Sequence, residues 1–121
     1  MVQSLNAKAD LVDEGTWFRG MAVYGKVMVG DKGFEFYNDK NVNDYIQIPW
    51  AEVNLVVADV YFRGRYIPRF EFRTQQNGNF IFAARHPKKV LRAISRYIPK
   101  NKMRQALTLW GRIKAAFVSH N

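Results

Sequence analysis

Apolar and polar side chains alternate along much of the first 85 residues of this 121-residue chain. In the segment 26–38, Val27 and Val29 precede a Gly-Asp-Lys-Gly turn, and Phe34 and Phe36 follow it. Successive side chains of a β-strand point to opposite faces, so a period of two indicates half-buried strands. The two glycines that bound the turn favour a hairpin. The pattern therefore predicts a β-rich fold.

The same alternation continues toward residue 84, and we expect about seven strands between residues 8 and 84. Asn77-Gly78 is a strong hairpin signal between two strand-like segments. From Arg65 to Arg73, the even-numbered residues are mostly aromatic and the odd-numbered ones mostly arginine. We expect the even positions to face the core and the odd positions to form an exposed basic face.

After Arg85 the apolar spacing changes from two to about 3.6 residues. Pro87 suits the first position of a helix, where its missing N–H costs nothing. The sequence predicts a helix over residues 87–98 and a second helix over residues 102–118. Trp110 and Phe117 lie on the apolar side of the second predicted helix, either as core residues or as a hydrophobic docking face.

Composition favours a single domain over residues 1–121. Hydrophobic residues make up 48% of the chain, which argues against disorder, and it has no cysteine. The N-terminus has no signal-peptide pattern, and no apolar run approaches the ~20 residues of a membrane span. We expect a cytoplasmic protein, either soluble or peripheral at the inner face of the membrane.

Charge is divided unevenly between the two halves of the chain. Residues 1–60 carry a net charge of −4, whereas residues 61–121 carry fourteen Lys and Arg against Glu71 alone, which gives +13. Such asymmetry favours an anionic partner, although basic side chains also serve solubility. The candidate anion- or partner-binding residues are Arg63, Arg65, Arg69, Arg73, Arg85, Lys88, Lys89, Arg92 and Arg96.

No motif in the sequence indicates catalysis, a metal or a cofactor. His86 and His120 are the only histidines, and neither belongs to a cluster with metal-ligand spacing. His86 precedes Pro87 and reads as a helix-cap residue, with phosphate acceptance as the alternative. We expect a protein that is not an enzyme.

Several segments resemble the pleckstrin-homology and GRAM superfold. The resemblance rests on the residues "IQIPWAEVNLV" at 46–56, followed by a strand, an Asn-Gly turn, a strand and a helix. It implies a barrel of about seven antiparallel strands capped by a C-terminal helix, hence an α+β, mainly β fold. The basic residues that phosphoinositide-binding members carry on their first two strands are largely missing here.

The chain as a whole resembles the ManO-like family of small uncharacterised proteins. The segments that carry this resemblance are "NAKADLV", "YGKVMVGDKGFEFYND", "NVNDYIQIPWAEV" and "HPKKVLRAI". These proteins are encoded beside mannose-class phosphotransferase systems in lactic acid bacteria and their relatives. The resemblance implies a bacterial cytoplasm and a link to sugar uptake, and it supplies no functional residues.

These observations lead to a hypothesis of a non-catalytic regulatory or accessory protein. It would bind an anionic protein partner, a component or regulator of a mannose-class sugar transporter, through its basic half. Two alternatives are a peripheral binder of anionic membranes that uses the last helix and a nucleic-acid-binding protein. A homodimer formed through the apolar face of the last helix is a further interpretation.

Overall fold

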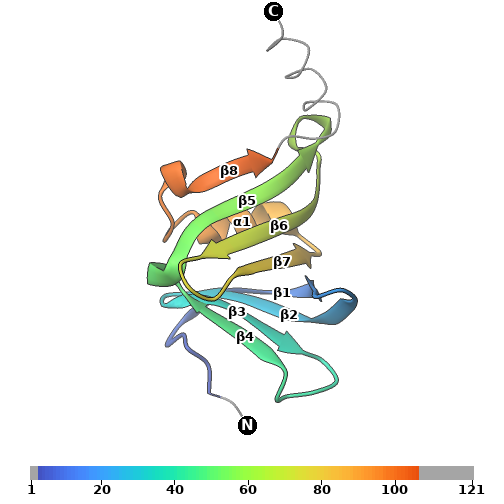
Figure 1. The fold of residues 1–121 in the computed structure, drawn as a ribbon, viewed down its shortest axis with the longest axis vertical. Coiled ribbons are helices and arrows are strands. Elements are labelled where there is room, and N and C mark those ends of the chain that lie inside the picture. Colours follow the sequence, from blue (N-terminus) through green and yellow to red (C-terminus); the bar gives the residue numbers. More distant parts are fainter. Residues whose placement is uncertain (1–2, 107–121) are drawn as a thin grey trace, which may run out of the picture.

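The computed structural model describes residues 3–106, which form one open, eight-stranded sheet and one α-helix (Figure 1). The strand order is β4-β3-β2-β1-β7-β6-β5-β8. Neighbouring strands are antiparallel except β5 and β8, which are parallel, so the sheet is mixed. The protein is therefore α+β and mainly β. The strands are β1 (Ala9–Phe18), β2 (Ala22–Gly30), β3 (Gly33–Asn38), β4 (Tyr45–Pro49), β5 (Val53–Tyr61), β6 (Tyr66–Thr74), β7 (Asn79–Ala84) and β8 (Met103–Ala106).

Short connections join most of the strands. Strands β2 and β3 form the predicted hairpin, in which Val29 pairs with Phe34. A second predicted hairpin joins β6 and β7, and Gly78 in its turn has a left-handed φ of 81°. The Thr74 hydroxyl donates a hydrogen bond to the Gly78 carbonyl at 2.6 Å. Because glycine adopts positive φ without a steric penalty, Asn77-Gly78 is a good local predictor of this turn.

A cluster of phenylalanines shows that the sheet curls strongly. Phe34 of β3 lies 4.5 Å from Phe72 of β6 and 4.8 Å from Phe82 of β7, measured between ring centroids. Three strands separate β3 from β6 in the sheet, so a flat sheet would hold these rings far apart. All three rings are fully buried. Their tilted contacts are those that aromatic quadrupoles favour, and they form the centre of the core.

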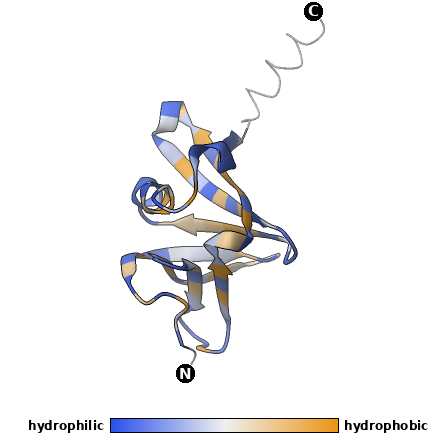
Figure 2. Ribbon diagram, turned by 90° about the vertical axis from the view of Figure 1, so that its left-hand side faces the viewer, coloured by the Kyte–Doolittle hydropathy of each residue, from blue (hydrophilic) through white to orange (hydrophobic). Residues whose placement is uncertain are grey.

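Helix α1 (Pro87–Ile94) covers the inner face of the curled sheet. It begins at Pro87, as the sequence predicts, and Val90 and Ile94 are fully buried against the strands. The helix ends four residues before its predicted end, and residues 95–98 continue as turns that bury Ile98. Figure 2 shows α1 to one side of the sheet, with hydrophobic and hydrophilic residues alternating along the strands.

The prediction of a helix from residue 102 is wrong at its start. Residues 100–102 form a single 3₁₀ turn after Pro99, and Met103–Ala106 form β8. Met103 pairs with Val56 in a parallel register along the outer edge of β5. An unpaired strand edge offers a row of backbone donors and acceptors, and these override local helix propensity. Residues 107–118 of the predicted helix lie outside the described residues.

Glu35 of β3 is a fully buried carboxylate on the side of the sheet opposite the phenylalanine core. The N-terminal segment covers it and supplies three of its hydrogen-bond donors, and the sheet supplies two more. Burial and the hydrogen bond to Glu35 raise the pKa of the Tyr37 phenol. The five donors and their distances to the carboxylate are Ser4 Oγ 2.6 Å, Leu5 N 2.6 Å, Asn6 Nδ2 2.9 Å, Tyr37 OH 2.6 Å and Gln47 Nε2 3.2 Å.

We predict that Glu35→Gln destabilises the fold by about 2–3 kcal/mol, because an amide offers one acceptor oxygen where five donors converge. Urea unfolding at neutral pH measures this. The control is Glu14→Gln, which removes a carboxylate whose ion pair is well exposed and should cost less than about 0.5 kcal/mol. Equal stability of the two variants would contradict the structural role of Glu35.

Candidate anion-binding pocket

A β-bulge at the start of β6 changes which side chains face α1. Asp59 of β5 pairs with Arg69, but Tyr61 pairs with Tyr66, so β6 holds one extra residue in this interval. Pro68 lies within the interval and has no N–H to donate to a ladder. As a result Ile67 packs against the core together with the buried Phe70. In a regular strand these two residues, three positions apart, would face opposite sides of the sheet.

The expected alternation from Arg65 to Arg73 is therefore wrong at its beginning. Phe70 and Phe72 are buried, as predicted, but Tyr66 is 55% exposed and Ile67 is partly buried. Before the bulge, Ile67 packs on the core and Tyr66 faces solvent, which is the reverse of the expected alternation. The basic residues of this segment therefore do not share one face of the sheet.

The bulge brings Arg65 to the beginning of α1, where it lines a cavity of about 310 Å³. Two segments far apart in the sequence build this cavity, namely the start of β6 and the junction of β7 with α1. No carboxylate lines the cavity, and Ile67 and Pro87 are the two apolar residues among those that do. The lining residues are Arg65, Ile67, Arg85, His86, Pro87, Lys88 and Lys89, which we call the basic pocket.

Two acidic residues of β1 lie beside the basic pocket and hold its β7–α1 side. Glu14 approaches Arg85 at 3.3 Å, and both side chains are well exposed. Asp13 accepts a hydrogen bond from the His86 N–H at 2.7 Å and lies 3.1 Å from His86 Nδ1. His86 precedes the helix, yet its side chain makes no capping hydrogen bond. Its ring contacts Asp13 instead.

Three cations of the basic pocket have no acidic partner within the described residues. Arg65, Lys88 and Lys89 are exposed, and none forms an ion pair with a carboxylate of residues 3–106. Converging cations that no carboxylate neutralises attract an anion, and backbone and apolar walls on one side strengthen that attraction. The pocket is thus suited to a small, multiply charged anion such as a phosphate group.

Arg69 and Arg73 lie elsewhere and are neutralised. Arg69 approaches Asp59 at 3.3 Å, and Arg73 Nε donates to Glu71 at 2.9 Å. Both arginines line a separate cavity of about 270 Å³ that also includes Ala106 of β8. These two candidate residues therefore do not join Arg65.

The remaining candidates are placed as follows. Arg63 is exposed in the turn between β5 and β6, Arg92 is exposed on α1, and Arg96 is exposed just after it. None of the three lines the basic pocket. Trp110 and Phe117, the candidate docking residues, lie outside the described residues.

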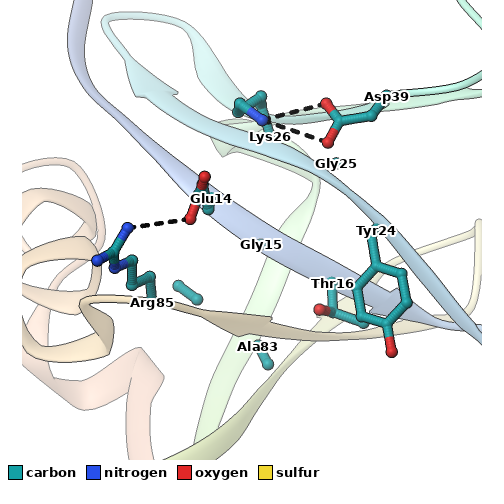
Figure 3. A pocket seen from close by; sticks show the side chains of 10 residues that line it. Glu14, Gly15, Thr16, Tyr24, Gly25, Lys26, Asp39, Ala83 and Arg85 are labelled. Atoms are coloured by element: carbon teal, nitrogen blue, oxygen red, sulfur yellow. Dashed lines mark hydrogen bonds and ion pairs between the residues drawn. The ribbon is translucent and has the colours of Figure 1, made fainter.

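Figure 3 shows a larger groove, of about 430 Å³, that the sequence did not indicate. Gly15 of β1 pairs with Gly25 of β2 near its centre. At either glycine a Cβ atom would collide with neighbouring strands, at 2.9 Å from the Ala83 carbonyl and 2.0 Å from the Tyr37 carbonyl, respectively. The glycines thus permit the close packing of the curled sheet.

Ion pairs border this groove and cancel its charge. Arg85 pairs with Glu14, and Lys26 lies 3.2 Å from Asp39 (Figure 3). Two cations and two anions therefore line it, in contrast to the basic pocket. Only the strand register brings these residues together, so no local sequence signal could have identified the groove.

The described residues show neither a metal centre nor a membrane span. Within residues 3–106, no three His, Asp or Glu side chains gather in an arrangement that could hold a metal ion. In the same range, no helix has the length and apolar character that a membrane crossing requires.

We predict that Asp13→Asn lowers stability by roughly 1–2 kcal/mol at neutral pH and progressively less below about pH 4. Burial acts to raise the pKa of Asp13, but the hydrogen bonds and charge of His86 outweigh it and lower the pKa below the usual 3.8. A carboxyl group whose pKa is lower in the folded protein than in the unfolded chain stabilises the fold at pH values above the unfolded pKa. This stabilisation is lost as the pH falls through the folded pKa. Urea unfolding from pH 7 to pH 2.5 tests this, and a difference independent of pH would refute it.

Comparisons with known proteins agree with the fold and identify a family. No curated protein matches the chain. Among solved structures, the crystal structure of the C-terminal domain of an unknown protein from Leishmania infantum is similar, with a TM-score of 0.63 and 11% identity, over 74% of this chain and 83% of that chain. At this identity the likeness concerns the fold alone. A family model described as a domain of unknown function, DUF956, matches residues 1–117. The chain therefore belongs to the DUF956 family.

Proposed function

We propose that this protein is a non-catalytic binding module that captures an anionic, phosphate-bearing group of a partner in its basic pocket. The observation that carries the proposal is the convergence of Arg65, Lys88 and Lys89 on one cavity that no carboxylate lines. Arg85 and His86 complete the cavity but already contact Glu14 and Asp13. A phosphate would satisfy the three cations that form no ion pair within residues 3–106.

The shape of the pocket favours a discrete anionic group over a nucleic acid. Sequence-independent binding of nucleic acid uses an extended basic groove and exposed aromatic rings on which bases stack. Phe70, Phe72 and Phe82 are buried in the core, and Arg69 and Arg73 are paired with acids on another part of the sheet. Around the cavity, the cations that form no ion pair within residues 3–106 are Arg65, Lys88 and Lys89.

The resemblance to ManO-like proteins suggests which partner this is. In our proposal the module acts in the bacterial cytoplasm on a component of a mannose-class phosphotransferase transporter, whose subunits carry phosphate during transport. The curled sheet, in which β1–β7 pair antiparallel before α1 follows, supports a further proposal, that the fold is of the pleckstrin-homology and GRAM type. Charge in the C-terminal half would speed the encounter and make binding sensitive to salt.

We expect the double variant Lys88→Gln/Lys89→Gln to weaken binding of inorganic pyrophosphate by roughly tenfold. Isothermal titration at low salt measures this effect. The matched control is Arg69→Gln/Arg73→Gln, which removes the same charge outside the pocket and should leave the affinity within about twofold. If both double variants lose the same amount of pyrophosphate affinity, the net charge of the protein, and not the pocket, attracts the anion.

The partner is tested with purified cytoplasmic subunits of a mannose-class transporter, in phosphorylated and unphosphorylated form. The wild-type protein should retain the phosphorylated subunit at 50 mM salt and release it as salt rises. Lys88→Gln/Lys89→Gln should retain little of it at any salt concentration. Absence of retention at every salt concentration would reject the link to the transporter, while the pyrophosphate titration would still report on the pocket.

A further inference from the structure

The turn between β5 and β6 holds three consecutive residues in left-handed backbone conformation. Phe62 has a φ of 54°, Arg63 a φ of 58° and Gly64 a φ of 89°. Glycine adopts this conformation freely, but a residue with a Cβ atom does so at a cost. Phe62 and Arg63 are the only non-glycine residues with positive φ among residues 3–106. Strain of this kind concentrates at functional positions.

The strained turn projects an aromatic side chain into solvent. Phe62 is 75% exposed, the highest value among the large hydrophobic residues of the described chain. Tyr61, which is partly buried, lies 6.5 Å from Phe62 and 6.1 Å from Tyr66, between ring centroids, so it joins the two exposed rings into one cluster. We call Tyr61, Phe62 and Tyr66 the aromatic tip. A soluble chain gains no stability from a phenylalanine that is held in water by a strained backbone.

Two arginines lie within the segment that forms the aromatic tip. Arg63 and Arg65 lie between Phe62 and Tyr66 in the chain, both are exposed, and neither pairs with a carboxylate of residues 3–106. Arg65 also lines the basic pocket, so Lys88 and Lys89 belong to the same end of the molecule. This end therefore combines a projecting aromatic turn with several positive charges.

We propose that the aromatic tip docks the protein onto an anionic phospholipid membrane, with Phe62 inserted at the interface and Arg63 against lipid phosphates. A projecting aromatic turn needs a surface that deforms around it, which a fluid bilayer provides. Interfacial binding combines burial of apolar area with attraction to anionic headgroups, and the tip supplies both contributions. The inference goes beyond the proposed function and does not depend on it, because Phe62 and Arg63 lie outside the basic pocket.

Vesicle sedimentation tests the proposal with the full chain. Wild-type protein should bind vesicles of phosphatidylglycerol and phosphatidylcholine much more strongly than vesicles of phosphatidylcholine alone. Phe62→Ala should lower the partition coefficient on the anionic vesicles about tenfold, because it removes the apolar area that inserts. Arg63→Gln should lower it about fivefold.

Two control variants match these changes elsewhere on the surface. Met21 is 68% exposed in the turn between β1 and β2, and Arg69 is paired with Asp59. Met21→Ala and Arg69→Gln should each leave the partition coefficient within about twofold of wild type. If all four variants bind alike, or if the wild type does not bind the anionic vesicles, the proposal is overturned.

A second measurement separates docking from stability. Phe62→Gly relieves the strain, so it should raise the midpoint of thermal unfolding while lowering vesicle binding at least as much as Phe62→Ala. Pyrophosphate binding by this variant should equal that of wild type, because the basic pocket is intact. Vesicle binding by Phe62→Gly at wild-type strength would overturn the proposal, whereas loss of pyrophosphate binding by Lys88→Gln/Lys89→Gln concerns only the proposed function.

Discussion

The packing of α1 against the phenylalanine core is the contact on which the rest of the arrangement depends. Phe34, Phe72 and Phe82 meet only because the sheet curls, and Val90 and Ile94 of α1 fill the inner face of that curl. Without the helix, these side chains would be exposed to water at a cost proportional to their apolar area. The same packing fixes where α1 begins, and so it determines where Lys88 and Lys89 lie.

Hydrogen bonds to two carboxylates hold the N-terminal segment and the junction between β7 and α1 in place. The buried Glu35 holds the N-terminal segment against the outside of β3, through the side chain of Ser4 and the backbone of Leu5, among other donors. On β1, two strands away from β3, Asp13 holds His86 at the junction between β7 and α1. A carboxylate that accepts several hydrogen bonds gives orientation that hydrophobic contact alone does not supply. Both acids come from the acidic half of the chain, and both act within the fold.

Local signals predicted the parts of the fold that local interactions determine. The hairpin at Asn77-Gly78 and the helix start at Pro87 follow from the conformations that these residues favour, and the structure contains both. Strand β8 was not predicted, because its conformation depends on the edge of β5, almost fifty residues earlier in the chain. The alternation rule also failed at Pro68, since a bulge is set by the pairing of two strands. Non-local pairing of this kind leaves no period in the sequence.

In the candidate site, too, the sequence predicted local features and missed those that depend on non-local pairing. The sequence identified the basic residues but not their grouping, because Arg65 joins Lys88 and Lys89 only through the bulge, whereas Arg69 and Arg73 pair with Asp59 and Glu71. The excess of positive charge in the C-terminal half is therefore partly neutralised within the chain. Among the candidate cations, Arg65, Lys88 and Lys89 line the basic pocket and form no ion pair within residues 3–106, and Arg65 lies three residues from Phe62, which the strained turn exposes.

The central claim is that anions bind in the basic pocket and not along the whole basic half of the chain. Backbone amide NMR during a titration with pyrophosphate tests it most directly. The account predicts saturable shifts confined to residues 65–67 and 85–89, with Arg69, Arg73 and Arg92 unaffected. Shifts of similar size at all of these arginines, or shifts that do not saturate, would contradict it.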